Sequence, residues 1–201
     1  MPQTAIKIEN VSFAYNGGGQ VLTDVDLAVE RGAFLAIIGP NGGGKTTLVK
    51  ILLGLLSPQQ GSVSVLGRDP AQNAPNVGYV PQHSNFETGF PITVKDVVLL
   101  GLKHARQHSF RRAGKYGDRA MSALEGVDMA DYASRRFDTL SGGQRQRVLV
   151  ARAMVSSPEL LLFDEPMSNI DPQGKICLFD ILSHLSESIT VAMVSHDLLS
   201  A

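Results

Sequence analysis

The first thirty residues contain two apolar stretches separated by a glycine-rich turn. One stretch runs from Ile6 to Tyr15, and the other, from Val21 to Val29, alternates apolar and polar residues as VLTDVDLAV. Residues 16–19, NGGG, lie between them. Alternation with a period of two is typical of a strand with one buried face, and a short glycine-rich connection favours a hairpin. The pattern therefore predicts an antiparallel β unit at the N-terminus.

Three later runs are apolar and short: Phe34–Ile38, Leu160–Phe163 and Thr190–Val194. Runs of this kind are typical of parallel strands that are covered on both faces. An apolar helix is predicted after the first run, from about Lys45 to Leu55, and another between the last two, from Pro172 to Leu185. The order strand, helix, strand indicates a parallel α/β sheet.

The middle of the chain, from about Thr93 to Met154, has the pattern of helices rather than strands. Thr93 precedes VKDVVLLGL and is a suitable N-cap residue for a helix there. We therefore predict a helical subdomain, inserted at about Phe86 to Leu140.

Composition narrows the class of protein. The chain has 201 residues with 43% hydrophobic and 18% charged residues, which predicts one globular domain. No run approaches the roughly 20 apolar residues that cross a bilayer, and Cys177 is the single cysteine, which suits a reducing compartment. The net charge of −1 does not favour nucleic acid as a partner. We interpret the basic segment Lys103–Arg119 as a solvated helical face, with nucleic-acid binding as the alternative.

The strongest motif is GPNGGGKT, from Gly39 to Thr46, which fits the pattern GxxxxGK[ST]. Glycines allow several backbone N–H groups to converge on phosphate oxygens, and the following helix directs its positive end at the same place. The Lys45 ammonium is expected to reach the β- and γ-phosphates, and the Thr46 hydroxyl to bind Mg²⁺. The motif follows an apolar strand and opens a helix, and that context indicates a phosphate-binding loop.

Two acids follow the apolar run at Leu160, in the sequence LLLFDEP. Asp164 at the end of a buried strand is expected to hold Mg²⁺ through its water shell. Glu165 is expected to orient or deprotonate the attacking water as a general base.

Residues 140–144 read LSGGQ, and here the chain resembles a known family, the ATP-binding subunits of ABC transporters. Ser141 is a suitable cap for a second helix N-terminus facing phosphate. The resemblance implies an α/β fold over residues 1–201: a P-loop NTPase (RecA-like) core with a parallel sheet, an N-terminal antiparallel β subdomain and an inserted helical subdomain. It also implies that the family's C-terminal segment is missing, because the chain ends five residues after His196.

The resemblance assigns further roles by position. The expected ATP contacts within one chain are Tyr15, Gly39, Pro40, Asn41, Gly42, Gly43, Gly44, Lys45, Thr46 and Thr47. The contacts expected from a partner chain are Ser141, Gly142, Gly143, Gln144 and Asp171. Gln82 matches the Q-loop, and His196 matches the switch histidine that would contact the γ-phosphate; both join Glu165 as catalytic residues. Thr46, Gln82 and Asp164 are expected around Mg²⁺. Asp171 closes SNID, whereas the commoner family pattern has Ala-Leu in the middle.

The function implied by the resemblance is ATP hydrolysis that powers transport. Expected partners are a second ATPase subunit, membrane permease subunits and an extracytoplasmic solute-binding protein, with the chain on the inner face of the cell membrane. Residues 76–82 and 90–101 resemble the zinc and manganese importers, and iron-chelate importers are the nearest alternative. A soluble ABC ATPase acting on nucleic acid or ribosomes is a rival, but it usually carries a long coiled coil or two ATPase units. A P-loop kinase or nucleotide switch would not explain LSGGQ.

Overall fold

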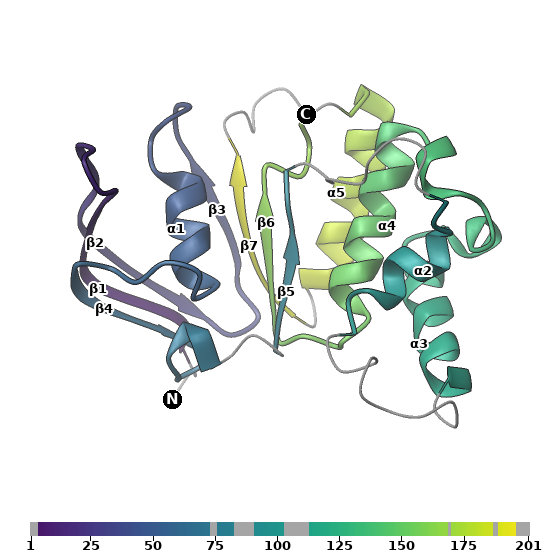
Figure 1. Ribbon diagram of the computed structural model, residues 1–201, viewed down its shortest axis with the longest axis horizontal. Coiled ribbons are helices and arrows are strands. Elements are labelled where there is room, and N and C mark those ends of the chain that lie inside the picture. The colour runs from purple at the N-terminus through teal and green to yellow at the C-terminus, as the bar shows by residue number, and fades with distance from the viewer. Residues whose placement is uncertain are drawn as a thin grey trace.

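The computed structural model describes residues 4–72, 76–82, 91–102, 113–168, 170–186 and 189–195. Two sheets and a group of helices lie side by side along its longest axis (Figure 1). The strands are β1 (Thr4–Ala14), β2 (Gln20–Glu30), β3 (Phe34–Ile38), β4 (Gln60–Val65), β5 (Val77–Val80), β6 (Leu160–Asp164) and β7 (Thr190–Ser195). The helices are α1 (Lys45–Leu52), α2 (Val94–Leu99), α3 (Ala113–Glu125), α4 (Gly142–Met154) and α5 (Pro172–Ser186).

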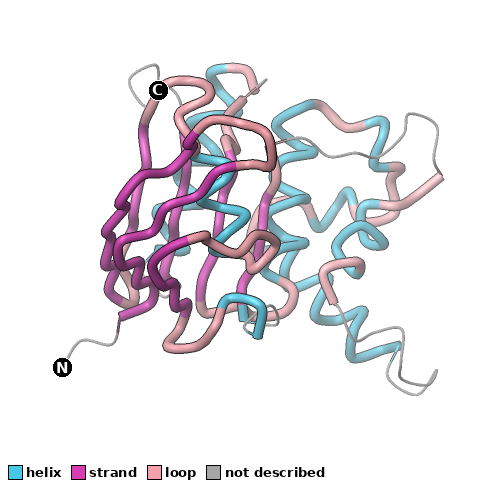
Figure 2. Tube along the Cα trace, turned by 60° about the vertical axis from the view of Figure 1, so that its left-hand side comes forward, coloured by secondary structure: helices cyan, strands magenta, loops and turns pink. Residues whose placement is uncertain are grey.

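The N-terminal sheet is antiparallel, in the order β2-β1-β4. The predicted hairpin corresponds to β1 and β2, but β4 was not predicted. Its sequence, QGSVSV, is half polar and gives little hydrophobic signal. At Gly61 the backbone has φ 82°, and a Cβ there would lie 2.3 Å from the carbonyl oxygen of Glu9, so this strand needs glycine to approach β1. Figure 2 shows this sheet on the near side of the molecule.

The second sheet is parallel, in the order β3-β7-β6-β5. It contains the three predicted apolar runs, which confirms the parallel α/β core. β5 was missed because it has only four residues, one of them Gly78, and so falls short of a strand pattern. The carboxyl ends of parallel strands meet at one edge, which brings the loops after β3 and β6 together.

Helices cover both faces of the parallel sheet. α1 packs between the two sheets, where Leu48, Ile51 and Leu52 meet Leu160 and Leu162 in one hydrophobic core. α4 and α5 cover the other face, and α2 and α3 extend that layer outward (Figure 1). The two cores lie on opposite faces of the same strands, so the parallel sheet fixes α1 and α4 relative to each other.

The described part of the middle of the chain is helical, as the sequence predicted. Thr93 is the N-cap of α2: its hydroxyl accepts a hydrogen bond from the Asp96 amide, and Asp96 caps the Thr93 amide in return. The described α-helices of this part are α2 and α3, with two short 3-10 turns at Ala130–Tyr132 and Phe137–Thr139 before α4 begins at Gly142. Residues 86–90 and 103–112 of the predicted subdomain and basic segment lie outside the described residues. α1 ends at Leu52 rather than Leu55 because Gly54, with φ 69°, follows it.

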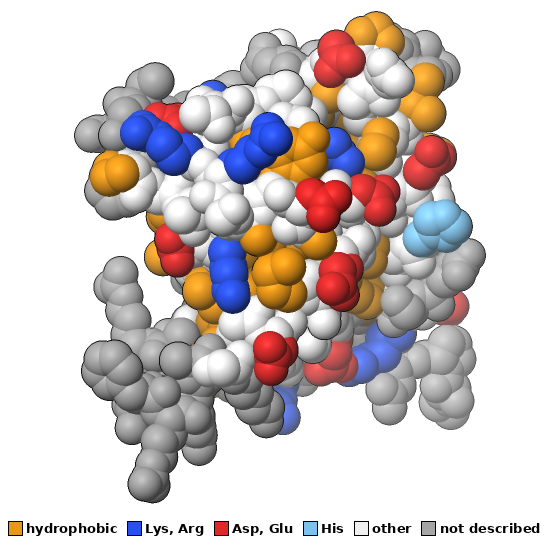
Figure 3. Space-filling view, turned by 90° about the vertical axis from the view of Figure 1, so that its right-hand side faces the viewer, with side chains coloured by type: hydrophobic (Ala, Val, Ile, Leu, Met, Phe, Trp, Pro, Cys, Tyr) orange, Lys and Arg blue, Asp and Glu red, His pale blue; other side chains and the backbone are white. Residues whose placement is uncertain are grey.

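The surface of the helical layer mixes both charge signs with small apolar patches (Figure 3). Over the described ranges, none of the helices has the length and apolar character that crossing a membrane requires.

Candidate functional site

The loop between β3 and α1 forms a cradle of backbone amides. Gly44 is the N-cap of α1, with φ 81°, and no side chain caps the amides of the first turn. A Cβ at Gly44 would lie 2.8 Å from the Leu22 side chain and 2.9 Å from the Val21 carbonyl oxygen, so a larger residue does not fit. Uncapped amides at a helix N-terminus, with the positive end of the helix dipole, are suited to an anion.

Lys45 points its ammonium into this cradle and is 8% exposed. Its Nζ donates hydrogen bonds to the carbonyl oxygens of Gly39 (2.9 Å) and Pro40 (3.0 Å). The same Nζ lies 3.7 Å from Oε1 of Glu165. The ammonium is therefore held by neutral carbonyls and one carboxylate at the mouth of a phosphate-sized cradle, where phosphate oxygens can replace them.

Asp164 ends β6 beneath the first turn of α1. The Thr46 hydroxyl donates a hydrogen bond to its Oδ1 over 3.2 Å. Burial raises the pKa of Asp164 above its usual value, because the ionised form loses water, and the neighbouring Glu165 charge raises it further. Hydrogen bonds from Thr46 and Tyr79 and the nearby Lys50 charge oppose that rise in pKa. A hydroxyl beside a buried carboxylate is a donor set that suits Mg²⁺.

Glu165 follows in the left-handed region, with φ 48°, which is unusual for a residue other than glycine. Its Oε2 accepts a hydrogen bond of 2.9 Å from Nε2 of Gln82, which lies two residues after the end of β5. The Glu165 amide donates to the carbonyl of Val194, at the end of β7. A strained backbone held from both neighbouring strands directs this carboxylate toward Lys45.

Lys45, Thr46, Gln82 and Glu165 line a cavity of about 640 Å³. Its walls are Tyr15, Val21, Asn41, Gly42, Gly44, Lys45, Thr46, Thr47, Gln82, Glu165 and Ser168. Tyr15 lies at the rim, 42% exposed, with its ring edge-on to Phe13 and its hydroxyl 3.2 Å from the Thr47 hydroxyl. A half-exposed ring in this position leaves a face for a planar base. Val21 and Ser168 were not among the predicted ATP contacts: Val21 carries no motif signal, and Ser168 opens the SNID segment, of which only Asp171 was expected at a nucleotide.

The LSGGQ segment forms the start of α4, on the other face of the sheet. The Ser141 hydroxyl accepts from the Gln144 amide, and the Gln144 side chain accepts from the Ser141 amide. The first turn packs against the start of α5: a Cβ at Gly143 would lie 3.8 Å from Oδ1 of Asp171. The structure thus brings together the residues expected to act in a partner's site. No wall of the phosphate cavity is drawn from the described residues of α4.

The two groups of predicted site residues therefore lie apart within one chain. Most of the first group lines one cavity: Tyr15, Asn41, Gly42, Gly44 to Thr47, Gln82 and Glu165. Gly39 and Pro40 bond to Lys45, Gly43 to Pro40 and Asp164 to Thr46 behind that wall. Ser141 to Gln144 and Asp171 form a second group. His196 lies outside the described residues.

A family model described as "ABC transporter" matches residues 22–168. The chain belongs to the ABC transporter family. It is an ATP-binding subunit of that family, an ABC ATPase, and the match runs from the strand beside the phosphate loop through Ser168.

Two relatives illustrate the likeness of this ABC ATPase to named proteins. A Chlamydia trachomatis protein named "Probable metal transport system ATP-binding protein" is 45% identical over 192 residues, covering 95% of this chain and 81% of that protein. The zinc uptake system ATP-binding protein ZurA of Listeria innocua is 40% identical over 201 residues, covering 97% and 77%.

A solved structure agrees with the fold of the ABC ATPase. CbiO1 from Clostridium perfringens, part of the ABC transporter complex cbiONQ, superposes with a TM-score of 0.83 at 26% identity. The alignment covers 97% of this chain and 79% of that chain.

Proposed function

We propose that this ABC ATPase hydrolyses ATP in the presence of Mg²⁺ at a site completed by a second copy of the chain. The observation that carries the proposal is the convergence of Lys45, Thr46, Asp164, Glu165 and Gln82 at the carboxyl edge of the parallel sheet. Each group has the chemistry that phosphate-bond hydrolysis needs: an ammonium for the phosphates, a hydroxyl and a carboxylate for the metal, and a second carboxylate for water.

When phosphate binds, Lys45 changes its hydrogen-bond and ion-pair partners. Its ammonium leaves the carbonyls of Gly39 and Pro40 and the Glu165 carboxylate for charged phosphate oxygens, which are stronger acceptors. Glu165 then keeps Gln82 and can accept a proton from water. A bound Mg²⁺, held by Thr46 and, through water, by Asp164 and Gln82, would neutralise the charge that develops on the phosphates. His196, expected after β7, would hydrogen-bond the γ-phosphate.

The second copy supplies the start of α4. In one chain that helix start lies on the opposite face of the sheet from α1, so Ser141 and Asp171 serve a neighbour's nucleotide rather than their own. Two chains meeting head-to-tail bury two nucleotides between them. Bound ATP favours the closed pair because both chains contact it, and hydrolysis removes that preference.

The transported solute is a divalent metal ion such as zinc or manganese, taken up through permease subunits fed by an extracytoplasmic solute-binding protein. The names of the two relatives, one for metal and one for zinc, support this assignment. The chain then works from the cytoplasmic face of the membrane.

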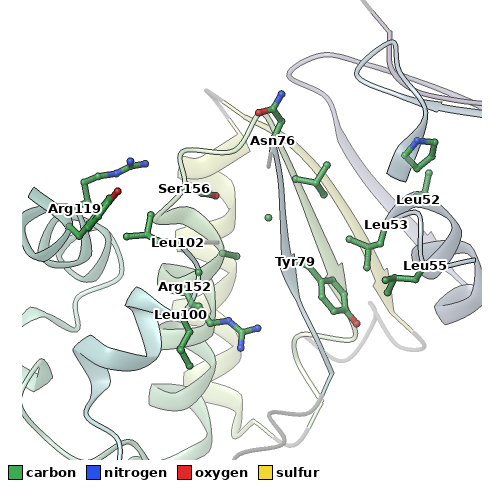
Figure 4. Close-up of a pocket in the computed structure, with 16 residues that line it drawn as sticks. Leu52, Leu53, Leu55, Asn76, Tyr79, Leu100, Leu102, Arg119, Arg152 and Ser156 are labelled. Carbon is green, nitrogen blue, oxygen red and sulfur yellow. The ribbon is translucent and has the colours of Figure 1, made fainter. Parts of the chain in front are cut away.

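A second cavity of about 600 Å³ offers a place for the permease to bind. It lies between the end of α1, β5 and the layer of α2, α3 and α4 (Figure 4). Leu55 and Leu100 are exposed on its walls, Arg119 and Arg152 supply positive charge, and its described lining contains no acid. An amphipathic helix of the permease with an acidic residue complements such a groove.

Glu165→Gln tests the proposed site directly. The amide keeps the hydrogen bond with Gln82 but cannot accept a proton, so nucleotide binding should persist while phosphate release falls by two or more orders of magnitude. Size-exclusion chromatography with Mg²⁺ and ATP should then show a dimer that wild-type protein forms only transiently. Wild-type turnover by a monomeric Glu165→Gln protein would refute both the base and the composite site.

A further inference from the structure

Tyr79 stands on β5 and lines the groove of Figure 4. In the parallel ladder it pairs with Leu162, two residues before Asp164 on β6. Side chains alternate along strands, so Tyr79, Leu162 and Asp164 share the face covered by α1. A diagonal neighbour two residues along is within reach of a long aromatic side chain. The register therefore puts Tyr79 on the same face as Asp164, with the Asp164 carboxylate within reach of its side chain.

The environment of Tyr79 keeps its hydroxyl a donor. Burial, with the neighbouring Asp164 charge, raises the pKa of Tyr79 to about 12, so the phenol stays protonated at any physiological pH. Its hydroxyl interacts with the Asp164 carboxylate as a donor. Two hydroxyls, those of Thr46 and Tyr79, therefore act on Asp164.

The two hydroxyls differ in their expected partners once Mg²⁺ and nucleotide bind. Thr46 belongs to the phosphate loop and is expected to bind the metal directly, so its oxygen is committed when Mg²⁺ enters. Tyr79 is held by the strand ladder and by packing against the α1 core, and it stays with the carboxylate. Hydrogen bonds to a carboxylate near a metal fix the orientation of its oxygens and commonly alter metal affinity by 10- to 100-fold.

We propose that Tyr79 is a positioning residue for the reaction: it holds the Asp164 carboxylate in the orientation that Mg²⁺-dependent hydrolysis requires. This inference rests on the proposed function, in which Asp164 serves the metal. No motif marks Tyr79 for this role, because it acts through the carboxylate and does not touch the nucleotide cavity.

Tyr79→Phe removes the hydroxyl and keeps the ring. We expect the Mg²⁺ concentration for half-maximal ATPase activity, at saturating ATP, to rise roughly tenfold or more. Binding of a fluorescent ATP analogue in EDTA should stay within twofold of wild type, because the phosphate loop is untouched. A merely structural role for the hydroxyl would change thermal stability but not separate these two readouts.

Tyr132→Phe is the matched control. Tyr132 is half-buried in the helical layer, with the Arg135 guanidinium over its ring, and lines neither the nucleotide cavity nor the groove. It should leave the Mg²⁺ dependence unchanged. A wild-type Mg²⁺ dependence in Tyr79→Phe would overturn the inference while leaving the proposed function intact. Wild-type protein with no Mg²⁺-dependent hydrolysis would instead refute the proposed function.

Discussion

At the scale of single residues, the site contains buried charges that pair with each other and that a bound phosphate would separate. Lys45 and Glu165 are both largely buried and lie 3.7 Å apart, with Gln82 on the other carboxylate oxygen. Buried opposite charges lose hydration, and their pairing offsets that loss. A phosphate that binds Lys45 competes with Glu165 for the same ammonium. Nucleotide binding is therefore expected to release the Glu165 carboxylate from Lys45.

Lys45→Ala removes the ammonium that faces the phosphates. Charge-assisted hydrogen bonds contribute about 1.5–3 kcal/mol each, so ATP affinity should fall roughly ten- to hundredfold. A fluorescent-nucleotide titration measures it. Lys7→Ala, which removes an exposed lysine paired with Glu9 on β1, is the control and should bind like wild type. Unchanged affinity in Lys45→Ala would contradict the phosphate cradle.

Asp164→Asn should stabilise the metal-free protein at neutral pH. The pKa of Asp164 is raised in the folded state by burial, so the ionised carboxylate disfavours folding and the neutral form does not. The neutral Asp164 carboxyl contributes to the free energy of unfolding at low pH. That contribution is lost as the pH rises through the raised pKa of the folded state.

Urea denaturation in EDTA across pH gives the check. Asp164→Asn should exceed wild type near neutrality, and the difference should shrink as the pH falls. The exposed Asp180→Asn controls for surface charge. A difference that grows toward low pH would contradict this assignment.

At the scale of elements, two helices begin with the same capping box and test whether a cap also serves function. Thr93 with Asp96 opens α2, and Ser141 with Gln144 opens α4. Removing either hydroxyl should cost about 1 kcal/mol of unfolding free energy.

Thr93→Ala and Ser141→Ala should therefore lose similar stability in chemical denaturation. Ser141→Ala alone should also show slower turnover and weaker ATP-dependent dimerisation, because its hydroxyl is proposed to face the partner's nucleotide. Equal activity losses in the two variants would mean that Ser141 acts only as the helix cap of α4 and not at the partner's nucleotide.

The sequence predicted the elements whose patterns are strong. β3, β6, β7 and α5 agree with their predicted bounds within one residue, since buried parallel strands are continuous apolar runs. β4 and β5 were not predicted, because β4 is half polar and β5 is only four residues long. Register, which no local pattern encodes, pairs Tyr79 with Leu162 and so puts it on the same face of the sheet as Asp164.

At the scale of the whole molecule, the parallel sheet separates two half-sites. The phosphate loop and α1 lie on one face, and α4 lies on the other (Figure 1). Motifs identified the residue types of both half-sites. The Glu165 backbone at φ 48° and the Lys45–Glu165–Gln82 chain come only from tertiary contacts, so the sequence could not predict them.

Cysteine cross-linking tests the head-to-tail pairing most directly. Replacing the single native cysteine, Cys177→Ser, gives a clean background, to which Glu165→Gln adds a block on hydrolysis. One preparation carries Asn41→Cys in the phosphate loop and another carries Ser141→Cys at the start of α4. We predict that their mixture forms a disulfide-linked dimer with Mg²⁺ and ATP and little with Mg²⁺ and ADP, while neither preparation does so alone. An ATP-loaded mixture in which residues 41 and 141 never cross-link would contradict the composite site.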